Sequence, residues 1–203
     1  MAIELKKGAR ISLEKKSNGA LGEMLVNLNW NKESVKKGFL SSLSGGRGKG
    51  IDLDLGCLFE LKNGSKGCVQ ALGNAFGSLS NPPFISLDGD DRTGESAGGE
   101  NLRINGDKIS QFKRILIYTF IYEGAADWKQ TNGIVTIKYP GSQDIIIRMD
   151  DYSSSQNMCG IALLENSGDE TFSVEKLVRF FSGHRDLDRA YGWGMKWVAG
   201  SKD

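Results

Sequence analysis

Residues 86–101 hold the densest group of chemically useful side chains in the sequence. The stretch reads SLDGDDRTGESAGGEN and contains five carboxylates, one cation and four glycines. No large apolar side chain follows Leu87 until Leu102, so the stretch buries little apolar surface and is predicted to form a loop. A solvated acidic loop is the simplest interpretation.

The same stretch also has the composition of a cation site. Crowded carboxylates repel one another unless protons or a cation neutralise them. Glycines let the backbone curl and turn several oxygens inward, and carboxylates, hydroxyls, amides and carbonyls are the hard ligands of which calcium takes about six to eight. An EF-hand is excluded, because Arg92 and Thr93 stand at the fifth and sixth positions counted from Asp88.

A second acidic segment lies upstream, where the sequence reads GIDLDLGCLF over residues 50–59. Apolar Ile51 and Leu53 alternate there with Asp52 and Asp54, which is the periodicity of a strand with two carboxylates on one face. The simplest interpretation is a solvated face. These carboxylates could also reach an ion held by a neighbouring loop.

Together the two segments resemble the TerD family of tellurium-resistance and stress proteins. Members of that family carry a strand similar to FDLDAS, followed by an acidic loop similar to GDNxTGEGxGDDE. The strand counterpart here is IDLDLG from Ile51, and the loop counterpart is GDDRTGE from Gly89, followed by GGEN. Asp91 replaces the usual Asn, and Gly99 and Asn101 stand where acids are common, so one of the family's two calcium positions is expected to be weak or empty.

The resemblance implies a calcium-binding stress-response protein that acts as a binding or scaffold module and not as an enzyme. Residues 122–128 (YEGAADW) and 191–197 (YGWGMKW) look closer to the TerA branch than to TerD itself. Expected partners are calcium ions and proteins of the same stress system. The implied ligands are Asp52, Asp54, Asp88, Asp90, Asp91, Thr93, Gly94, Glu95 and Glu100, and Glu123 would join them if its loop folds beside the acidic loop.

The composition favours one cytoplasmic domain spanning residues 1–203. The net charge of +1 argues neither for nor against a charged partner. Residues 1–50 carry ten Lys or Arg against four Glu and could meet an anionic surface, but scattered lysines on strand faces are usually solvated, and no nucleic-acid partner is expected. The three cysteines Cys57, Cys68 and Cys159 have no metal-ligand spacing and fit a reducing compartment. The sequence shows no signal-peptide pattern, and its longest apolar run, residues 115–122, is far shorter than the ~20 residues of a membrane span.

The pattern of short alternating segments predicts an all-β fold, a β-sandwich of two mainly antiparallel sheets. Asn63-Gly64 marks a hairpin turn, and residues 115–122, apolar on both faces, are expected to form a central strand. A short helix fits residues 183–190, and residues 171–182 are compatible with a helix or a strand. Further strands are expected at residues 3–14, 23–30, 51–59, 101–106, 133–139, 144–149 and 159–165, and Trp193, Met195 and Trp197 follow at strand spacing.

Catalytic machinery is hard to find. The single histidine, His184, lies in a segment expected at the surface, and no GxSxG nucleophile motif is present. One alternative is a hydrolase that uses Asp88, Asp90 and Glu95 as acid and base. Another, by analogy with other sandwiches, is a calcium-dependent module that contacts a membrane surface or a ligand. Trp193 and Trp197 are expected in the core and Trp128 in an exposed loop.

Overall fold

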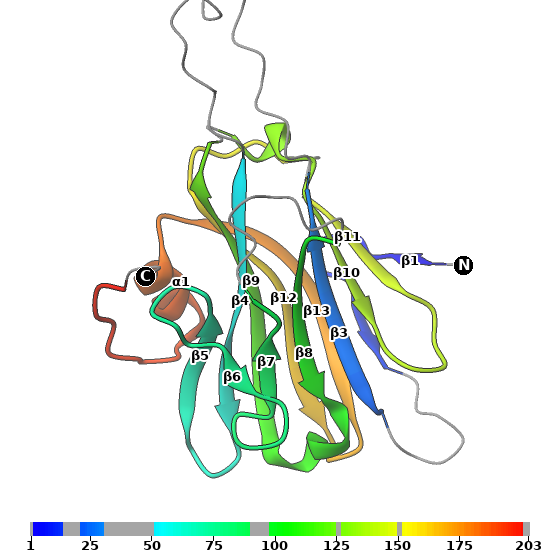
Figure 1. Cartoon of the computed structure of the whole chain (residues 1–203). Coiled ribbons are helices and arrows are strands. Elements are labelled where there is room, and N and C mark those ends of the chain that lie inside the picture. Colours follow the sequence, from blue (N-terminus) through cyan, green and yellow to red (C-terminus); the bar gives the residue numbers. More distant parts are fainter. Residues whose placement is uncertain are drawn as a thin grey trace, which may run out of the picture.

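The computed structural model describes residues 2–13, 21–30, 51–89, 98–124, 127–149 and 152–200. In these residues the chain forms two β-sheets packed face to face, with helix α1 (His184–Tyr191) beside the outer face of one of them (Figure 1). Two short 3-10 segments, η2 (Gly106–Gln111) and η3 (Trp128–Gln130), are also described. The predicted β-sandwich with a short helix near its C-terminal end is therefore confirmed.

The first sheet has seven strands in the order β1-β11-β10-β3-β8-β7-β6, and we call it sheet A. Its neighbouring strands pair antiparallel, except for β1 with β11, which is parallel. The strands are β1 (Ile3–Glu4), β3 (Glu23–Asn29), β6 (Gly77–Ser78), β7 (Ile85–Leu87), β8 (Glu100–Asn105), β10 (Ile134–Lys138) and β11 (Ile145–Arg148).

The second sheet, sheet B, has six antiparallel strands in the order β2-β13-β12-β9-β4-β5. The apolar strand predicted at the centre, β9, lies between β12 and β4, and the Asn63-Gly64 turn joins β4 to β5 as expected. The strands are β2 (Arg10–Ser12), β4 (Asp52–Leu61), β5 (Lys66–Gln70), β9 (Phe112–Glu123), β12 (Met158–Ser167) and β13 (Thr171–Phe181).

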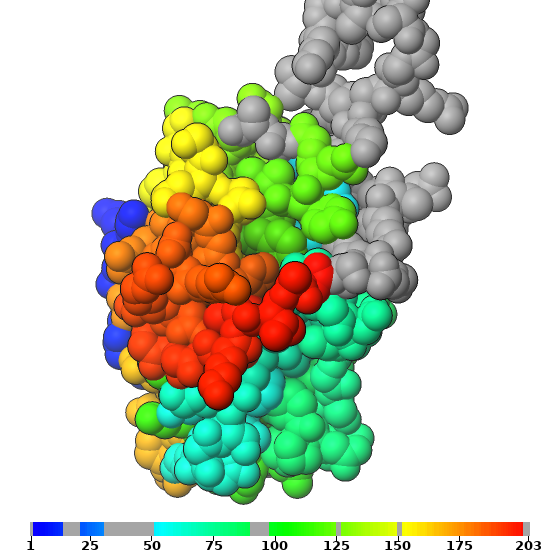
Figure 2. All heavy atoms as spheres, turned by 90° about the vertical axis from the view of Figure 1, so that its left-hand side faces the viewer, coloured from blue at the N-terminus to red at the C-terminus, as the bar shows by residue number. Residues whose placement is uncertain are grey.

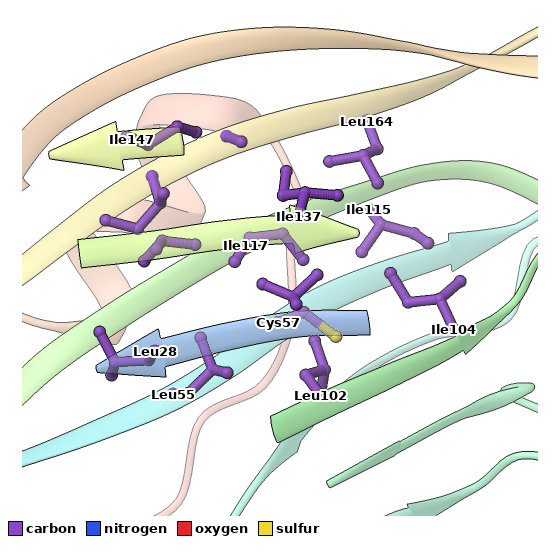
Figure 3. Close-up of a cluster of buried hydrophobic side chains, with 14 of the residues drawn as sticks. Leu28, Leu55, Cys57, Leu102, Ile104, Ile115, Ile117, Ile137, Ile147 and Leu164 are labelled. Carbon is purple, nitrogen blue, oxygen red and sulfur yellow. The ribbon is translucent and has the colours of Figure 1, made fainter. Parts of the chain in front are cut away.

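The main core fills the space between the two inner sheet faces. Its side chains come from alternate positions of the strands, because successive residues of a strand point to opposite faces. Each large side chain buried in this way contributes about 1.5–3 kcal/mol relative to an exposed one. The cluster drawn in Figure 3 includes Leu28, Leu55, Cys57, Leu102, Ile104, Ile115, Ile117, Ile137, Ile147 and Leu164.

Sheet B is also covered on its outer face. A second buried cluster there combines strand residues with residues of α1 and of the segment that follows it. Strands β4 and β9 are therefore buried on both faces, which explains why β9 lacks a polar face. The cluster consists of Leu58, Leu116, Tyr118, Phe120, Met158, Phe181, Leu187 and Trp193.

The two-sided burial of sheet B also resolves the ambiguous residues 171–182. Val174 and Val178 pack in the core between the sheets, whereas Leu177 and Phe181 pack in the outer cluster. Their apparent helical spacing is thus produced by a strand, β13, that is apolar on both faces.

The single strand expected over residues 3–14 is wrong. A turn with Gly8 at a φ of 76° separates β1 from β2, and the two short strands join different sheets. Strand β1 pairs with β11 in sheet A, and β2 pairs with β13 in sheet B. The alternation seen in the sequence therefore crosses from one layer of the sandwich to the other.

The segment after α1 has no regular secondary structure, although Trp193, Met195 and Trp197 are spaced like strand residues. The buried carboxylate of Asp188 organises it instead. This carboxylate accepts hydrogen bonds from the backbone N–H of Gly194 at 2.7 Å, from that of Met195 at 2.9 Å and from Nε1 of Trp197 at 2.8 Å. Trp193 is buried as predicted.

The close contact between Gly56 and Tyr118 gives a first testable prediction. A Cβ added at Gly56 would lie 2.7–2.9 Å from the Tyr118 ring, which is fully buried and held by its hydroxyl. Gly56→Ala is therefore expected to lower the free energy of unfolding by about 1–3 kcal/mol through overpacking. Chemical denaturation monitored by circular dichroism measures this change.

The matched control is Gly98→Ala, because a Cβ at Gly98 would meet no atom within 4 Å and its φ is not positive. Its effect is expected to stay within about 0.5 kcal/mol. Combining Gly56→Ala with Tyr118→Leu should recover part of the loss, because the smaller side chain removes the clash. Equal effects of the two alanine substitutions would contradict the packing argument.

Candidate functional site

The predicted acidic loop connects two neighbouring strands of sheet A. Strand β7 ends at Leu87 and β8 begins at Glu100, and the backbone N–H of Asp88 donates to the carbonyl of Asn101 at 3.0 Å. Both ends of the loop are thus held at one edge of the sandwich. Five of the predicted ligands lie outside the described residues, namely Asp90, Asp91, Thr93, Gly94 and Glu95.

Glu100 connects the loop to the second acidic segment. It lies on the inner face of β8 with 2% of its surface exposed, and its Oε2 accepts a hydrogen bond from the backbone N–H of Leu55 at 2.6 Å. Strand β5 pairs with β4 only as far as Gly56, so the next amide is available to this carboxylate. A side chain of sheet A thereby takes the place of a strand neighbour in sheet B.

Strand β3 holds both acidic segments from the side. The amide Nδ2 of Asn27 donates to the carbonyl of Gly98 at 2.5 Å and to Oδ1 of Asn101 at 2.9 Å. Just beyond the strand, Nε1 of Trp30 donates to the carbonyl of Ile51 at 2.8 Å. These bonds fix where the loop returns and where β4 begins, and the sequence patterns did not single out either donor.

Asp54 is the clearest departure from the sequence analysis. Its alternation with core residues Leu53 and Leu55 is confirmed, but its side chain is fully buried and not solvated. The reason is that the outer face of sheet B is covered, and Asp54 stands opposite Phe120 on that face. Burying an ionised carboxylate costs free energy unless a cation or hydrogen-bond donors replace the lost water, so an ionised Asp54 requires such compensation.

Asp52 and Glu123 face each other across the β4–β9 pair. Asp52 is half-buried and Glu123 is exposed. Like charges at directly opposite positions destabilise a pair of strands, and a cation close to both carboxylates offsets this cost. This cross-strand position puts Glu123 beside the second acidic segment. That its loop lies beside the acidic loop stays a prediction, because residues 90–97 are outside the described residues.

Asp88 points elsewhere. Both of its carboxylate oxygens accept hydrogen bonds from Nε of Arg103, at 2.7 and 2.8 Å. Arg103 also donates to Glu23 at 2.6 Å, and these residues alternate with the core positions of their strands, on the outer face of sheet A. The structure therefore ties Asp88 to a cation of the protein and separates it from Glu100, which points inward.

The donor set fits a hard cation only when the loop is included. Among the described residues, no group of three or more His, Cys, Asp or Glu side chains is arranged to hold a metal ion. The described acids among the predicted ligands of the two segments, Asp52, Asp54, Glu100 and Glu123, offer oxygen atoms alone, which suits calcium better than a transition metal. Any ion here would need further ligands from residues 90–97, which are not described.

Comparison with known proteins identifies the family. The model of the TerD domain matches residues 1–175. The chain belongs to the TerD family. It is 44% identical over 192 residues to the tellurium resistance protein TerA of an Alcaligenes species, covering 95% of this chain and 56% of TerA. It therefore spans little more than half of that relative.

Two further relatives support the family and the fold. The stress response protein SCP2 of Bacillus subtilis is 34% identical over 174 residues, covering 84% of the TerD-family chain and 82% of SCP2. A crystal structure of a homologue of the telluride resistance protein TerD from Streptomyces coelicolor matches with a TM-score of 0.54 at 16% identity, covering 83% of this chain and 95% of that one. No helix among the described residues is long and apolar enough to cross a membrane.

Two aromatic residues of this TerD-family chain lie differently from the sequence-based expectation. Trp128 is fully buried, and its Nε1 donates to the carbonyl of Gln156 at 2.6 Å, so it is not an exposed loop aromatic. His184 is half-buried under the segment that follows α1, packed edge-on against the rings of Tyr118 and Phe120. Desolvation lowers the pKa of His184 to about 4.

The Glu100 contact yields the second prediction. Glu100→Ala leaves the N–H of Leu55 without its acceptor, and an unsatisfied buried donor costs about 1–3 kcal/mol. Glu100→Gln retains an acceptor oxygen and is expected to lose less. Urea unfolding of both variants in the presence of a chelator measures the difference, and an alanine variant as stable as the glutamine variant would refute the role of this bond.

The third prediction concerns pH. The folded-state pKa of His184, about 4, lies below the ordinary value of 6.5, so the folded protein binds fewer protons than the unfolded chain between these values. The stabilisation is fully present above pH 6.5 and is lost as the pH falls towards 4. At pH 4.5 the loss amounts to about 2 kcal/mol relative to pH 7.

Carboxylates titrate over the same range, so the comparison is made with His184→Phe, which keeps an aromatic ring. The difference in free energy of unfolding between the two proteins should shift by about 2 kcal/mol in favour of the variant between pH 7 and pH 4.5. A pH-independent difference would show that His184 titrates normally.

Proposed function

We propose that this chain is a calcium-binding stress-response protein of the tellurium-resistance type, which acts in the cytoplasm as a binding or scaffold module and not as an enzyme. The observation that carries the proposal is the hydrogen bond from the backbone of Leu55 to Glu100. It brings the returning end of the acidic loop next to the strand that carries Asp54. Relatives named for tellurium resistance and stress response supply the biological setting.

The proposed ligands come from both acidic segments. Asp52, Asp54, Glu100 and Glu123 are at hand on the strands, and the loop from Asp90 to Glu95 would complete the oxygen set. Calcium tolerates six to eight ligands in irregular geometry, whereas magnesium demands a near-octahedral arrangement and gives up its water reluctantly. A glycine-rich loop that closes over strand carboxylates therefore favours calcium. When bound, the ion would neutralise acids that repel one another.

The hydrolase alternative has less support. Asp88, one of the three carboxylates of that alternative, accepts hydrogen bonds from Arg103 on both of its oxygens, so its side chain is engaged within the protein. His184 lies under the C-terminal segment. It is hydrogen-bonded to Gln70 at the end of β5, which belongs to neither acidic segment. The other two carboxylates of that alternative, Asp90 and Glu95, lie outside the described residues.

A scaffold role follows from what the ion would do. Calcium that holds the loop against the strand ends would fix one end of the sandwich as a rigid surface, and proteins of the same stress system are the proposed partners. The chain itself would then change in order and surface charge with calcium, which suits a binding module. TerA is nearly twice as long as the matched region, so its further residues are outside this proposal.

The fourth prediction tests calcium binding by stability. A ligand at a hundred times its dissociation constant raises the free energy of unfolding by about 2.7 kcal/mol if it binds only the folded state. We expect a higher melting temperature in calcium than in chelator. Magnesium should raise the melting temperature much less. Asp54→Asn and Asp90→Asn should weaken the calcium effect, while stability in chelator holds or rises as charge repulsion is relieved.

Glu165→Gln is the matched control, because Glu165 is an exposed acid of β12 that pairs with Arg10, away from both acidic segments in sequence. Its calcium response should equal that of the wild type. Identical melts with calcium and with chelator, and no heat of calcium binding in calorimetry, would refute the proposal. Loss of a hydrolytic activity in Asp90→Asn with an unchanged calcium response would favour the enzyme instead.

A further inference from the structure

A cavity of about 840 Å³ opens beside the outer face of sheet B. Its walls are the end of β5 with the turn that follows, the N-terminal end of α1 and the segment after α1. Figure 2 shows this face, with the C-terminal segment in red lying across it. The volume falls within the range of about 300–1,000 Å³ that is typical of small-molecule sites.

A polar network at Gln70 forms one side of the cavity. Its Oε1 accepts from the hydroxyl of Tyr118 at 2.5 Å and lies 2.9 Å from Nε2 of His184, while its Nε2 donates to the carbonyl of Leu72 at 3.0 Å. Because the amide oxygen can only accept, Nε2 of His184 carries the proton. The imidazole is thereby fixed in one tautomer and lines the cavity as a neutral ring.

Much of the remaining lining is apolar and aromatic. The rings of Trp197 and His184 lie 5.0 Å apart between centroids at an angle of 46°. Leu72 and Met195 also line the space, as does Cys68, a thiol with a pKa raised by burial. These surfaces suit a flat aromatic body, because rings gain from tilted or offset contacts with other rings as well as from burial.

The cavity wall formed by the C-terminal segment is preformed. Asp188 holds Gly194, Met195 and Trp197 through three hydrogen bonds, and Nη2 of Arg185 reaches the carbonyl of Trp197 at 3.4 Å. The wall is therefore fastened to α1 at two points. A ligand that enters the cavity has little ordering of this segment to overcome.

The charges around the cavity are unbalanced. Among the described residues that line it, Arg185 and Lys196 contribute two cations, whereas Asp186 contributes one carboxylate, which lies 3.5 Å from Arg189 on the helix. A mixed lining of apolar side chains with an excess of positive charge complements a ligand that is apolar over most of its surface and anionic at one end.

We propose that this cavity binds a small organic anion with an aromatic body, such as an aromatic carboxylate. The ring lies against Trp197 and His184, and the anionic group lies near Arg185 and Lys196. The site shares no residue with the proposed calcium ligands, so it does not rest on the calcium proposal.

The probe for the test is 1-naphthoate, with 1-naphthamide as a neutral molecule of the same shape. Titration calorimetry and quenching of tryptophan fluorescence should show one binding event for the carboxylate and clearly weaker binding of the amide. Arg185→Gln should weaken 1-naphthoate binding by about fivefold, as expected when one partly exposed charge interaction is lost. Its effect on the neutral amide should be small.

Arg189→Gln is the matched control, because Arg189 stands on the same helix, is 81% exposed and does not line the cavity. It should bind 1-naphthoate like the wild type. Ala75→Trp, which fills the cavity, should abolish binding of both molecules in a protein whose circular dichroism is unchanged. If that variant does not fold, the comparison of the two arginine variants still tests the proposal.

Three outcomes would overturn the proposal. Equal losses of 1-naphthoate affinity in Arg185→Gln and Arg189→Gln would show a non-specific charge effect. Equal affinity for the amide and the carboxylate would show that the cavity does not recognise the anionic group. Absence of any binding at millimolar 1-naphthoate would show that the cavity is not a site for an aromatic carboxylate. A chelator should leave 1-naphthoate binding unchanged, so failure of the calcium proposal and failure of this one are distinguishable.

Discussion

The outer face of sheet B is apolar, and the need to cover it shapes the rest of the structure. Leu58, Leu116 and Phe120 stand on that face and would be left in water by a two-layer sandwich. Helix α1 and the segment after it bury them, with Trp193 fully enclosed. Because covering a large apolar face outweighs the cost of ordering an irregular segment, this part of the chain is fixed without belonging to a sheet.

Polar groups are also buried in the structure, and each is held by a specific contact. Glu100 is buried because it crosses to the backbone of Leu55, where β5 has ended. Asp188 is buried because it satisfies two amides and an indole of the C-terminal segment. Buried carboxylates of this kind are weak evidence for net stability, but they specify one arrangement, since no shifted register offers the same donors.

The sequence predicted the two-sheet sandwich, most of its longer strands and the short helix. Alternation placed Leu53 and Leu55 opposite Asp54, and the resemblance placed the acidic segments in one family. Alternation does not reveal what covers a face, so Asp54 and His184 were expected in water, whereas Asp54 is fully buried and His184 is half-buried. That cover depends on contacts between β4, β9 and residues more than sixty positions further along, which no local pattern records.

The outer face of β4 connects the two proposed sites through a chain of contacts. Asp54 stands on that face, and two residues along it Gly56 leaves room for the ring of Tyr118. The hydroxyl of Tyr118 binds Gln70, which in turn binds His184 in the cavity wall. Because these groups are close-packed on a doubly buried strand, the fold itself positions Asp54 and the Gln70 network, whereas the proposed calcium site also depends on ligands from residues 90–97.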